Sequence, residues 1–207
     1  MGVTEPDWFL TIAAFLCGFF VFKNLIEIII ILNRNFHHSK KDKSLLMNSG
    51  NFQFEYGIFE SISELQEEDA QLLEQARNVT QYAYSPYSNF KVGAFAKLKN
   101  GKTVSGTNQE NASYPAGICA ERTLMSTASS LFPGVGIETI AISYHNMNGR
   151  SDAPVSPCGI CRQSFVEFQQ RTGSTIRIIL SGMEGKVLVI KNASDLLPFN
   201  FSSEDMK

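Results

Sequence analysis

Three cysteines stand in an arrangement that can bind a metal ion. Cys119 begins the segment CAER, and Cys158 and Cys161 lie in the segment PCGIC. Two cysteines separated by two residues at a helix start can place both sulfurs on one ion, and a third cysteine can come from the start of another helix. Three thiolates leave a tetrahedral zinc ion with an open fourth position, which holds water in catalytic sites. The pattern predicts a catalytic zinc site.

Two other kinds of site fit part of this pattern. A redox dithiol would use Cys158 and Cys161 but would not need Cys119. A structural zinc site would need a fourth protein ligand, and His145 is the one histidine after residue 46. A histidine at a strand end is more often a surface residue than a ligand. The cysteines by themselves leave both alternatives open.

Glu121 lies two residues after Cys119 and favours the catalytic interpretation. With Cys119 on the metal at a helix start, a carboxylate at this distance can reach the metal's water without binding the metal. It can then take a proton from that water and pass it on. A glutamate in the first turn of a helix is also favourable with the helix dipole, so Glu121 is informative only together with the cysteines.

The elements that must position these residues are predicted to alternate between strands and helices. Apolar residues recur at helical spacing over 63–82, where Ser63 can cap the helix start. Further helices are predicted over 119–130 and 159–171. Strands are predicted over 90–99, 102–108, 138–144, 175–181 and 186–191, the first two joined by the turn dipeptide Asn100-Gly101. This order indicates an α/β fold with a central, mixed five-stranded sheet flanked by helices.

Composition divides the chain near Met47 into residues 1–46 and a domain over residues 47–207. The chain has 207 residues, a net charge of -2 and four cysteines, which excludes collagenous, disordered and disulfide-framework proteins. The second part has the length of one globular domain with a single core. It contains no block of basic residues, so we expect no nucleic-acid partner held through its phosphates.

The first part contains an apolar segment, 9–32, with a basic flank over 34–43. It is long enough to cross a bilayer as a helix, and the flank would then keep the following domain cytoplasmic. Lys23 and Glu27 would lie towards the middle of that span, where a charge is costly. The alternative is that these residues are translated upstream DNA and that the chain starts at Met47, because residues encoded by AT-rich codons dominate here. Membrane contact is expected only in the first case.

Three segments together identify a family resemblance. FKVGA, TNQENASYPAGICAERT and PVSPCGICRQ resemble cytidine deaminases of the compact type with three cysteine ligands. The resemblance extends from about Glu64 to the tail LLPFNFSSEDMK, and the segment NQEN narrows it from deaminases in general to those of cytidine or deoxycytidine. It implies a cytidine-deaminase-like three-layer fold, one Zn²⁺ per chain, and hydrolysis of cytidine and 2'-deoxycytidine to the uridines with release of ammonia.

The resemblance also implies a role for individual residues. Glu121 is expected to carry protons from the water to ring N3 and then to the leaving amino group. The other expected roles are zinc binding by Cys119, Cys158 and Cys161, moderation of the thiolates' charge by Arg122, ribose binding by Asn108 and Glu110, packing of Phe90 beside the pyrimidine, and main-chain contacts to the base from Ala120 and Ser156. Phe201 matches a tail residue that reaches into the site of a neighbouring subunit.

The expected partners are a small nucleoside and further copies of this chain in a homotetramer with shared sites. Three thiolate ligands require a reducing compartment, so we expect a cytoplasmic enzyme of pyrimidine salvage. Two other functions remain open from the sequence. One is deamination of another cytosine-bearing nucleoside, and the other is a zinc-stabilised binding module without activity.

Overall fold

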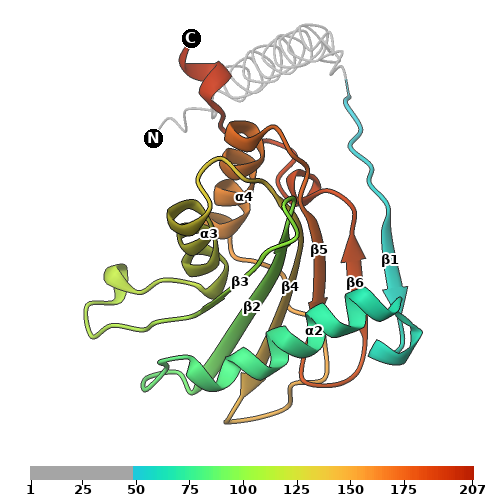
Figure 1. The fold of residues 1–207 in the computed structure, drawn as a ribbon, viewed down its shortest axis with the longest axis vertical. Helices are drawn as coiled ribbons and strands as arrows, with labels where there is room; N and C mark the ends of the chain where they lie inside the picture. The colour runs from blue at the N-terminus through green and yellow to red at the C-terminus, as the bar shows by residue number, and fades with distance from the viewer. Residues whose placement is uncertain (1–48) are drawn as a thin grey trace, which may run out of the picture. The chain divides into compact units, whose positions relative to one another are not determined.

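A mixed sheet of six strands organises residues 49–207, the part of the chain that the computed structural model describes (Figure 1). The strands are β1 (Tyr56–Phe59), β2 (Phe90–Leu98), β3 (Thr103–Thr107), β4 (Ile137–Asn146), β5 (Arg177–Ser181) and β6 (Val187–Ile190). Their order across the sheet is β1-β6-β5-β4-β2-β3. Strands β4 and β5 are parallel, and every other neighbouring pair is antiparallel.

Helices cover both faces of the sheet and make it the middle of three layers. Helix α2 (Glu67–Val79) packs on one face, whereas α3 (Ala120–Leu131) and α4 (Gly159–Thr172) pack on the other (Figure 1). Alternation along β4 shows the division, because Ile140 and Ile142 belong to the core under α3 and α4 and Ala141 belongs to the core under α2. The predicted three-layer α/β fold is therefore confirmed.

Two glycines allow helices to approach the sheet closely. A Cβ atom on Gly93 of β2 would lie 2.3 Å from the carbonyl oxygen of Ala76 in α2. A Cβ atom on Gly106 of β3 would lie 2.3 Å from the backbone nitrogen of Leu124 in α3. Since real Cβ atoms essentially never come so near to backbone atoms, glycine is required at both positions for this packing. Gly106 thus fixes the distance between α3 and its edge strand.

The structure corrects two of the predicted elements. The sheet has six strands rather than five, because β1 pairs with β6 and was not predicted. The first helix does not begin at Ser63, since residues Ile62–Glu64 form a short 3-10 turn and Leu65 is extended. Helix α2 instead begins after Gln66 and ends at Val79, and a second 3-10 turn continues to Tyr82. The five predicted strands are all present, with ends shifted by at most two residues.

The predictions for the N-terminal part lie outside the described residues. Segment 9–32 and the boundary at Met47 therefore stay predictions. Within residues 49–207, no helix is long and apolar enough to cross a membrane. The folded unit treated below is Phe52–Lys207.

Candidate active site

The three cysteines lie together where two helices begin. Cys119 is the N-cap of α3, Cys158 is the N-cap of α4, and Cys161 lies in the first turn of α4. The sulfur of Cys158 lies 3.8 Å from that of Cys119 and 3.5 Å from that of Cys161, and all three lie within 4.8 Å of one another. Two sulfurs bound to one tetrahedral zinc at about 2.3 Å each would lie about 3.8 Å apart. The cysteine cluster therefore fits a zinc ion, and it is the one group of its kind within residues 49–207.

The surroundings favour a thiolate at Cys119. Its pKa is lowered to about 6, chiefly by a hydrogen bond from the Cys161 thiol and further by Cys158 and the positive charge of Arg122. Burial opposes this shift. The pKa of Cys161 is raised, because its proton is held by Cys119 and because the group is buried. Both helix N-termini add partial positive charge next to the sulfurs.

Glu121 is buried beside the cysteine cluster. It lies in the first turn of α3, its exposed fraction is 5 %, and burial raises the pKa of its carboxyl group. Burial disfavours the charged form of a carboxyl group, so this one accepts a proton more readily than an exposed glutamate does. A carboxyl group with a raised pKa is suited to accept and release protons in acid–base catalysis.

A cavity of about 220 Å³ opens onto the cysteine cluster, and we call it the site cavity. Its lining residues are Phe90, Val92, Asn108, Cys119, Ala120, Glu121, Ile142, Ser143, Tyr144, Val155, Ser156, Pro157, Cys158 and Ser181. Strands β2 and β4 contribute apolar side chains and also Ser143 and Tyr144, and further polar groups come from the two helix starts and the ends of β3 and β5. The cavity thus lies outside the carboxyl ends of the parallel strands β4 and β5, the usual place for ligands in an α/β sheet.

The structure brings most of the predicted substrate residues to this cavity. Phe90, Asn108, Ala120 and Ser156 all contribute to its lining. The side chain of Asn108 bonds the backbone of β2, accepting from the N–H of Val92 at 2.7 Å and donating to the carbonyl of Phe90 at 2.9 Å. The amide of Asn108 is therefore held against the start of β2, next to the backbone of Phe90.

Comparison with known proteins agrees with this geometry. The family described as "Cytidine and deoxycytidylate deaminase zinc-binding region" matches residues 66–175, more than half of the chain. The chain belongs to this deaminase family. That assignment also explains why the matched region contains the cysteine cluster, Glu121 and most of the site cavity.

Individual relatives extend the similarity over nearly their whole length. A cytidine deaminase of Halalkalibacterium halodurans is 37% identical over 135 residues, which cover 65% of this chain and 95% of that protein. A probable cytidine deaminase of Dictyostelium discoideum is 34% identical over 145 residues, covering 68% and 88%. The crystal structure of cytidine deaminase from Burkholderia pseudomallei is 38% identical with a TM-score of 0.56, covering 66% of this chain and 100% of the other. That from Mycobacterium tuberculosis is 27% identical with a TM-score of 0.51, covering 67% and 99%.

Glu110 lies outside the site cavity of this deaminase, unlike the other predicted substrate-binding residues. It does not line the site cavity but a neighbouring one of about 340 Å³, together with Tyr87 and Tyr114. Its carboxylate accepts hydrogen bonds from the hydroxyl of Ser88 and from the backbone N–H groups of Tyr87 and Ser88. The bond from the Ser88 hydroxyl is the largest cause of its lowered pKa. In this structure Glu110 holds the loop that leads into β2.

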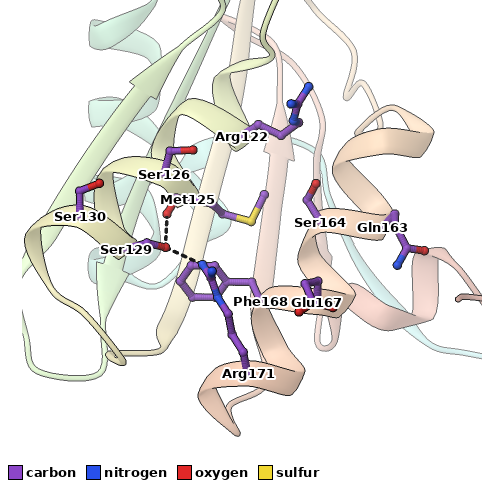
Figure 2. A pocket seen from close by; sticks show the side chains of 10 residues that line it. All are labelled: Arg122, Met125, Ser126, Ser129, Ser130, Gln163, Ser164, Glu167, Phe168 and Arg171. Atoms are coloured by element: carbon purple, nitrogen blue, oxygen red, sulfur yellow. Dashed lines mark hydrogen bonds between the residues drawn. The ribbon is translucent and has the colours of Figure 1, made fainter. Parts of the chain in front are cut away.

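Arg122 is turned to a second and larger cavity of the deaminase fold, which lies between the flanks of α3 and α4 (Figure 2). We call this the helix-flank cavity. It measures about 590 Å³ and is lined by Arg122, Met125, Ser126, Ser129, Ser130, Gln163, Ser164, Glu167, Phe168 and Arg171. The charge of Arg122 contributes to the low pKa of Cys119. Within residues 49–207, Arg122 makes no hydrogen bond to a cysteine sulfur.

The fourth-ligand alternative is not supported within the described residues. His145 is not part of the cysteine cluster. Ile140 and Ile142 of β4 face α3 and α4, whereas Ala141 faces α2, so by alternation His145 lies on the α2 face of the strand. A redox dithiol does not account for the third sulfur, which lies within 4.8 Å of both others.

Two residues with clear places at the site were not predicted. Tyr144 lines the cavity and stacks on Phe90, and the sequence offers no signal for it beyond its position at a strand end. Arg162 directly follows Cys161 and donates hydrogen bonds to the carbonyls of Pro157 at 2.8 Å and Leu196 at 3.2 Å. It thereby fixes the loop that carries Ser156 and Cys158. The position of an arginine in the segment PCGICRQ could have suggested such a role.

Proposed function

We propose that this chain is a zinc-dependent deaminase that hydrolyses cytidine and 2'-deoxycytidine to uridine and 2'-deoxyuridine with release of ammonia. The observation that carries the proposal is the buried carboxyl group of Glu121 beside three convergent cysteines, two of which line the site cavity. The relatives named cytidine deaminase support the substrate class. The reaction would serve pyrimidine salvage.

The residues present divide the work of this reaction. A zinc ion held by Cys119, Cys158 and Cys161 would supply a Lewis acid that lowers the pKa of a water molecule. Glu121 takes the proton of that water and delivers it to ring N3, which makes C4 electrophilic. After the water oxygen has added at C4, Glu121 takes the proton of the new hydroxyl group and passes it to the amino group. The C4–N bond then breaks, a C4=O double bond forms, and ammonia leaves. The raised pKa of Glu121 suits a carboxyl group that must hold a proton between these transfers.

The remaining residues bind and orient the nucleoside. Phe90 offers an aromatic surface for the pyrimidine, and backbone groups at Ala120 and Ser156 meet the base edge. Asn108 binds the ribose from the end of β3. Glu110 contributes to ribose binding by holding the loop before β2, since its carboxylate is bonded to that loop. Arg122 moderates the negative charge of the three thiolates through its own charge, as its effect on Cys119 supports.

The active form is proposed to be a cytoplasmic homotetramer that shares its sites between subunits. Phe201 lies in the C-terminal tail and is 59% exposed, and Phe199 beside it is 94% exposed. The tail is held to α4, because Gln163 donates a hydrogen bond to the carbonyl of Phe201 at 2.6 Å. An exposed aromatic on a held tail is available to a neighbouring subunit. The free cysteines favour a reducing compartment.

The test is a substrate panel with the purified full chain and with a shortened chain that begins at Met47, zinc being quantified in each. Cytidine, 2'-deoxycytidine, free cytosine and a cytosine-containing single-stranded oligonucleotide are offered at equal concentration. The expected result is conversion of the two nucleosides, with little conversion of the base or the oligonucleotide. A folded, zinc-loaded protein that converts none of them would contradict the proposal and favour a binding module. Preference for the oligonucleotide would replace nucleosides by polynucleotides as substrate.

A further inference from the structure

Two stacked aromatic rings line the site cavity, and the proposed function assigns a role to only one of them, Phe90. The rings of Phe90 and Tyr144 lie 4.8 Å apart between centroids with an interplanar angle of 11°, and both line the cavity. We propose that Tyr144 is a positioning residue that holds the ring of Phe90 in the orientation required to bind the pyrimidine. It would set the affinity for the nucleoside and take no part in proton transfer. This inference rests on the proposed function and adds one residue to its machinery.

The backbone of Phe90 is already fixed by other groups. Its N–H donates to the hydroxyl of Ser88 at 3.0 Å, and its carbonyl accepts from the amide of Asn108 at 2.9 Å. Asn89 before it has a φ of 55°, so the chain turns sharply into β2 at this point. The freedom that remains to Phe90 is the rotation of its side chain. A half-buried ring at the start of a strand, beside an open cavity, needs a neighbour to select one orientation.

Tyr144 is the neighbour that can make this selection. It pairs with Val92 across β2 and β4, so it lies diagonally next to Phe90 on the same face of the sheet. Its own side chain is only 8% exposed. Ser143 beside it donates a hydrogen bond to the carbonyl of Gly182 at 3.1 Å, which ties this end of β4 to the end of β5. Phe90 therefore stacks on a ring that is itself buried, on a strand whose end is tied to its neighbour.

A fixed ring improves binding because less freedom is lost when the substrate arrives. Preorganised binding groups raise affinity mainly by reducing the cost of ordering. The effect should be equal for the ground state and the transition state, because Phe90 lines the cavity as an aromatic surface and carries no proton. Loss of the stack should therefore raise KM and leave kcat nearly unchanged.

Two substitutions of Tyr144 distinguish the role of its ring from the role of its hydroxyl group. The hydroxyl group makes no hydrogen bond to any residue within 49–207, so removing it should not weaken that part of the fold. Tyr144→Phe keeps the stacked ring, whereas Tyr144→Leu keeps apolar volume and loses the ring. The positioning role predicts that the phenylalanine variant retains the wild-type KM and the leucine variant does not.

The experiment measures kcat and KM for cytidine, and zinc content, in the full chain and its variants. Tyr144→Leu is expected to raise KM about ten-fold, which corresponds to the free energy of one well-placed aromatic contact. Its kcat and zinc content should stay within about two-fold of wild type, and Tyr144→Phe should stay within about two-fold in all three quantities. If Tyr144→Leu does not fold, Tyr144→Met provides a flexible side chain of similar volume, with the same rise in KM expected.

Two comparisons make the result specific. In a double-mutant cycle, Tyr144→Leu added to Phe90→Leu should raise KM by less than about two-fold, because its effect passes through Phe90. The matched control is Phe95→Leu, on the same strand but packed in the core under α2, which should leave KM unchanged.

Several results would overturn the inference. They are equal KM values in Tyr144→Leu and Tyr144→Phe, multiplying effects in the cycle, a fall confined to kcat, or an equal rise of KM in Phe95→Leu. Absence of turnover in the wild-type protein would instead overturn the proposed function, and with it this inference.

Discussion

The larger of two cavities on helix α3 is not the one that carries the chemical groups. The helix-flank cavity measures about 590 Å³ and has arginine, serine and glutamate side chains on the sides of two helices (Figure 2). The site cavity measures about 220 Å³ and lies at the starts of the same helices. Two cysteines, a buried carboxyl group and an aromatic pair face the site cavity. The flank of a helix presents side chains alone, whereas its start adds unpaired N–H groups and partial positive charge.

The comparison shows why reactive groups gather at one end of α3. Cys119 as an N-cap and Glu121 in the first turn share that end, so a short segment supplies both a thiolate and a proton carrier. In the helix-flank cavity, Arg171 is engaged by the hydroxyl of Ser129 and lies over the ring of Phe168 at 4.6 Å. The guanidinium group of Arg171 therefore already has partners within the fold. Volume is a weaker guide to this site than the chemistry of the lining.

The largest effect is expected when a metal ligand is removed. Cys119→Ala should abolish measurable turnover of cytidine and lower bound zinc to less than about one tenth of an equivalent per chain, because two thiolates cannot replace three in the cluster. Zinc is measured by atomic absorption and turnover by the loss of cytidine absorbance. The matched control is Cys17→Ala, since Cys17 lies outside the family match. Stoichiometric zinc in Cys119→Ala would contradict its assignment as a ligand.

The next effect separates chemistry from metal binding at the same helix start. Glu121→Gln should lower kcat by about 10²- to 10⁴-fold, the usual contribution of a general acid–base group. Zinc content should remain that of the wild-type chain, because Glu121 lies beside the cysteine cluster without belonging to it. Steady-state kinetics with parallel metal analysis checks both quantities. A variant with wild-type kcat would show that another group carries the protons.

A moderate effect is expected from moving α3 as a whole. Gly106→Ala should reduce the free energy of unfolding by about 1 to 3 kcal/mol, as overpacking usually does. The new methyl group would meet the backbone of Leu124 at 2.3 Å and push the start of α3 away from β3. Thermal unfolding measures the loss. Gly50→Ala is the matched control, since nothing lies within 4 Å of its Cβ position. Equal melting temperatures for both variants would contradict this account of α3.

The smallest effect is expected in the helix-flank cavity. Glu167→Gln makes the same chemical change as Glu121→Gln, but on the flank of α4. Turnover of cytidine and zinc content should both stay within about two-fold of wild type, as is usual for substitutions away from functional groups. The same kinetic assay checks this. A loss comparable with that of Glu121→Gln would mean that the two cavities do not differ as proposed.

Much of the site could be predicted from the sequence because its residues lie in short, local patterns. Cys119 and Glu121 are two residues apart at one helix start, and Cys158 and Cys161 are three apart at another, so the members of each pair are close in the chain before any distant contact forms. The family resemblance then joined the two pairs and added Asn108 and Phe90. The structure brings these six residues together, as the resemblance implied.

The remaining features depend on contacts between distant segments. Strand β1 has four residues and pairs with β6, about 130 positions later in the chain, so no local pattern marks it. The predicted start of α2 was wrong. Ser63 is a residue type that commonly caps helices, but Leu65 adopts an extended conformation and the helix begins after Gln66. Tyr144 becomes part of the site only when β4 is placed beside β2. These features depend on tertiary packing, and the intrinsic preferences of individual residues carry no information about it.

The most direct test of the central claim is a zinc titration of metal-free protein followed by cytidine turnover. The full chain is stripped with a chelator and then given increasing amounts of zinc, and the initial rate of uridine formation is measured at each point. The account predicts that activity rises linearly and reaches its plateau at about one zinc per chain, as for a single site with three cysteine ligands. Full activity in the zinc-free protein would contradict the account. So would the absence of any turnover in folded protein that has bound one zinc per chain.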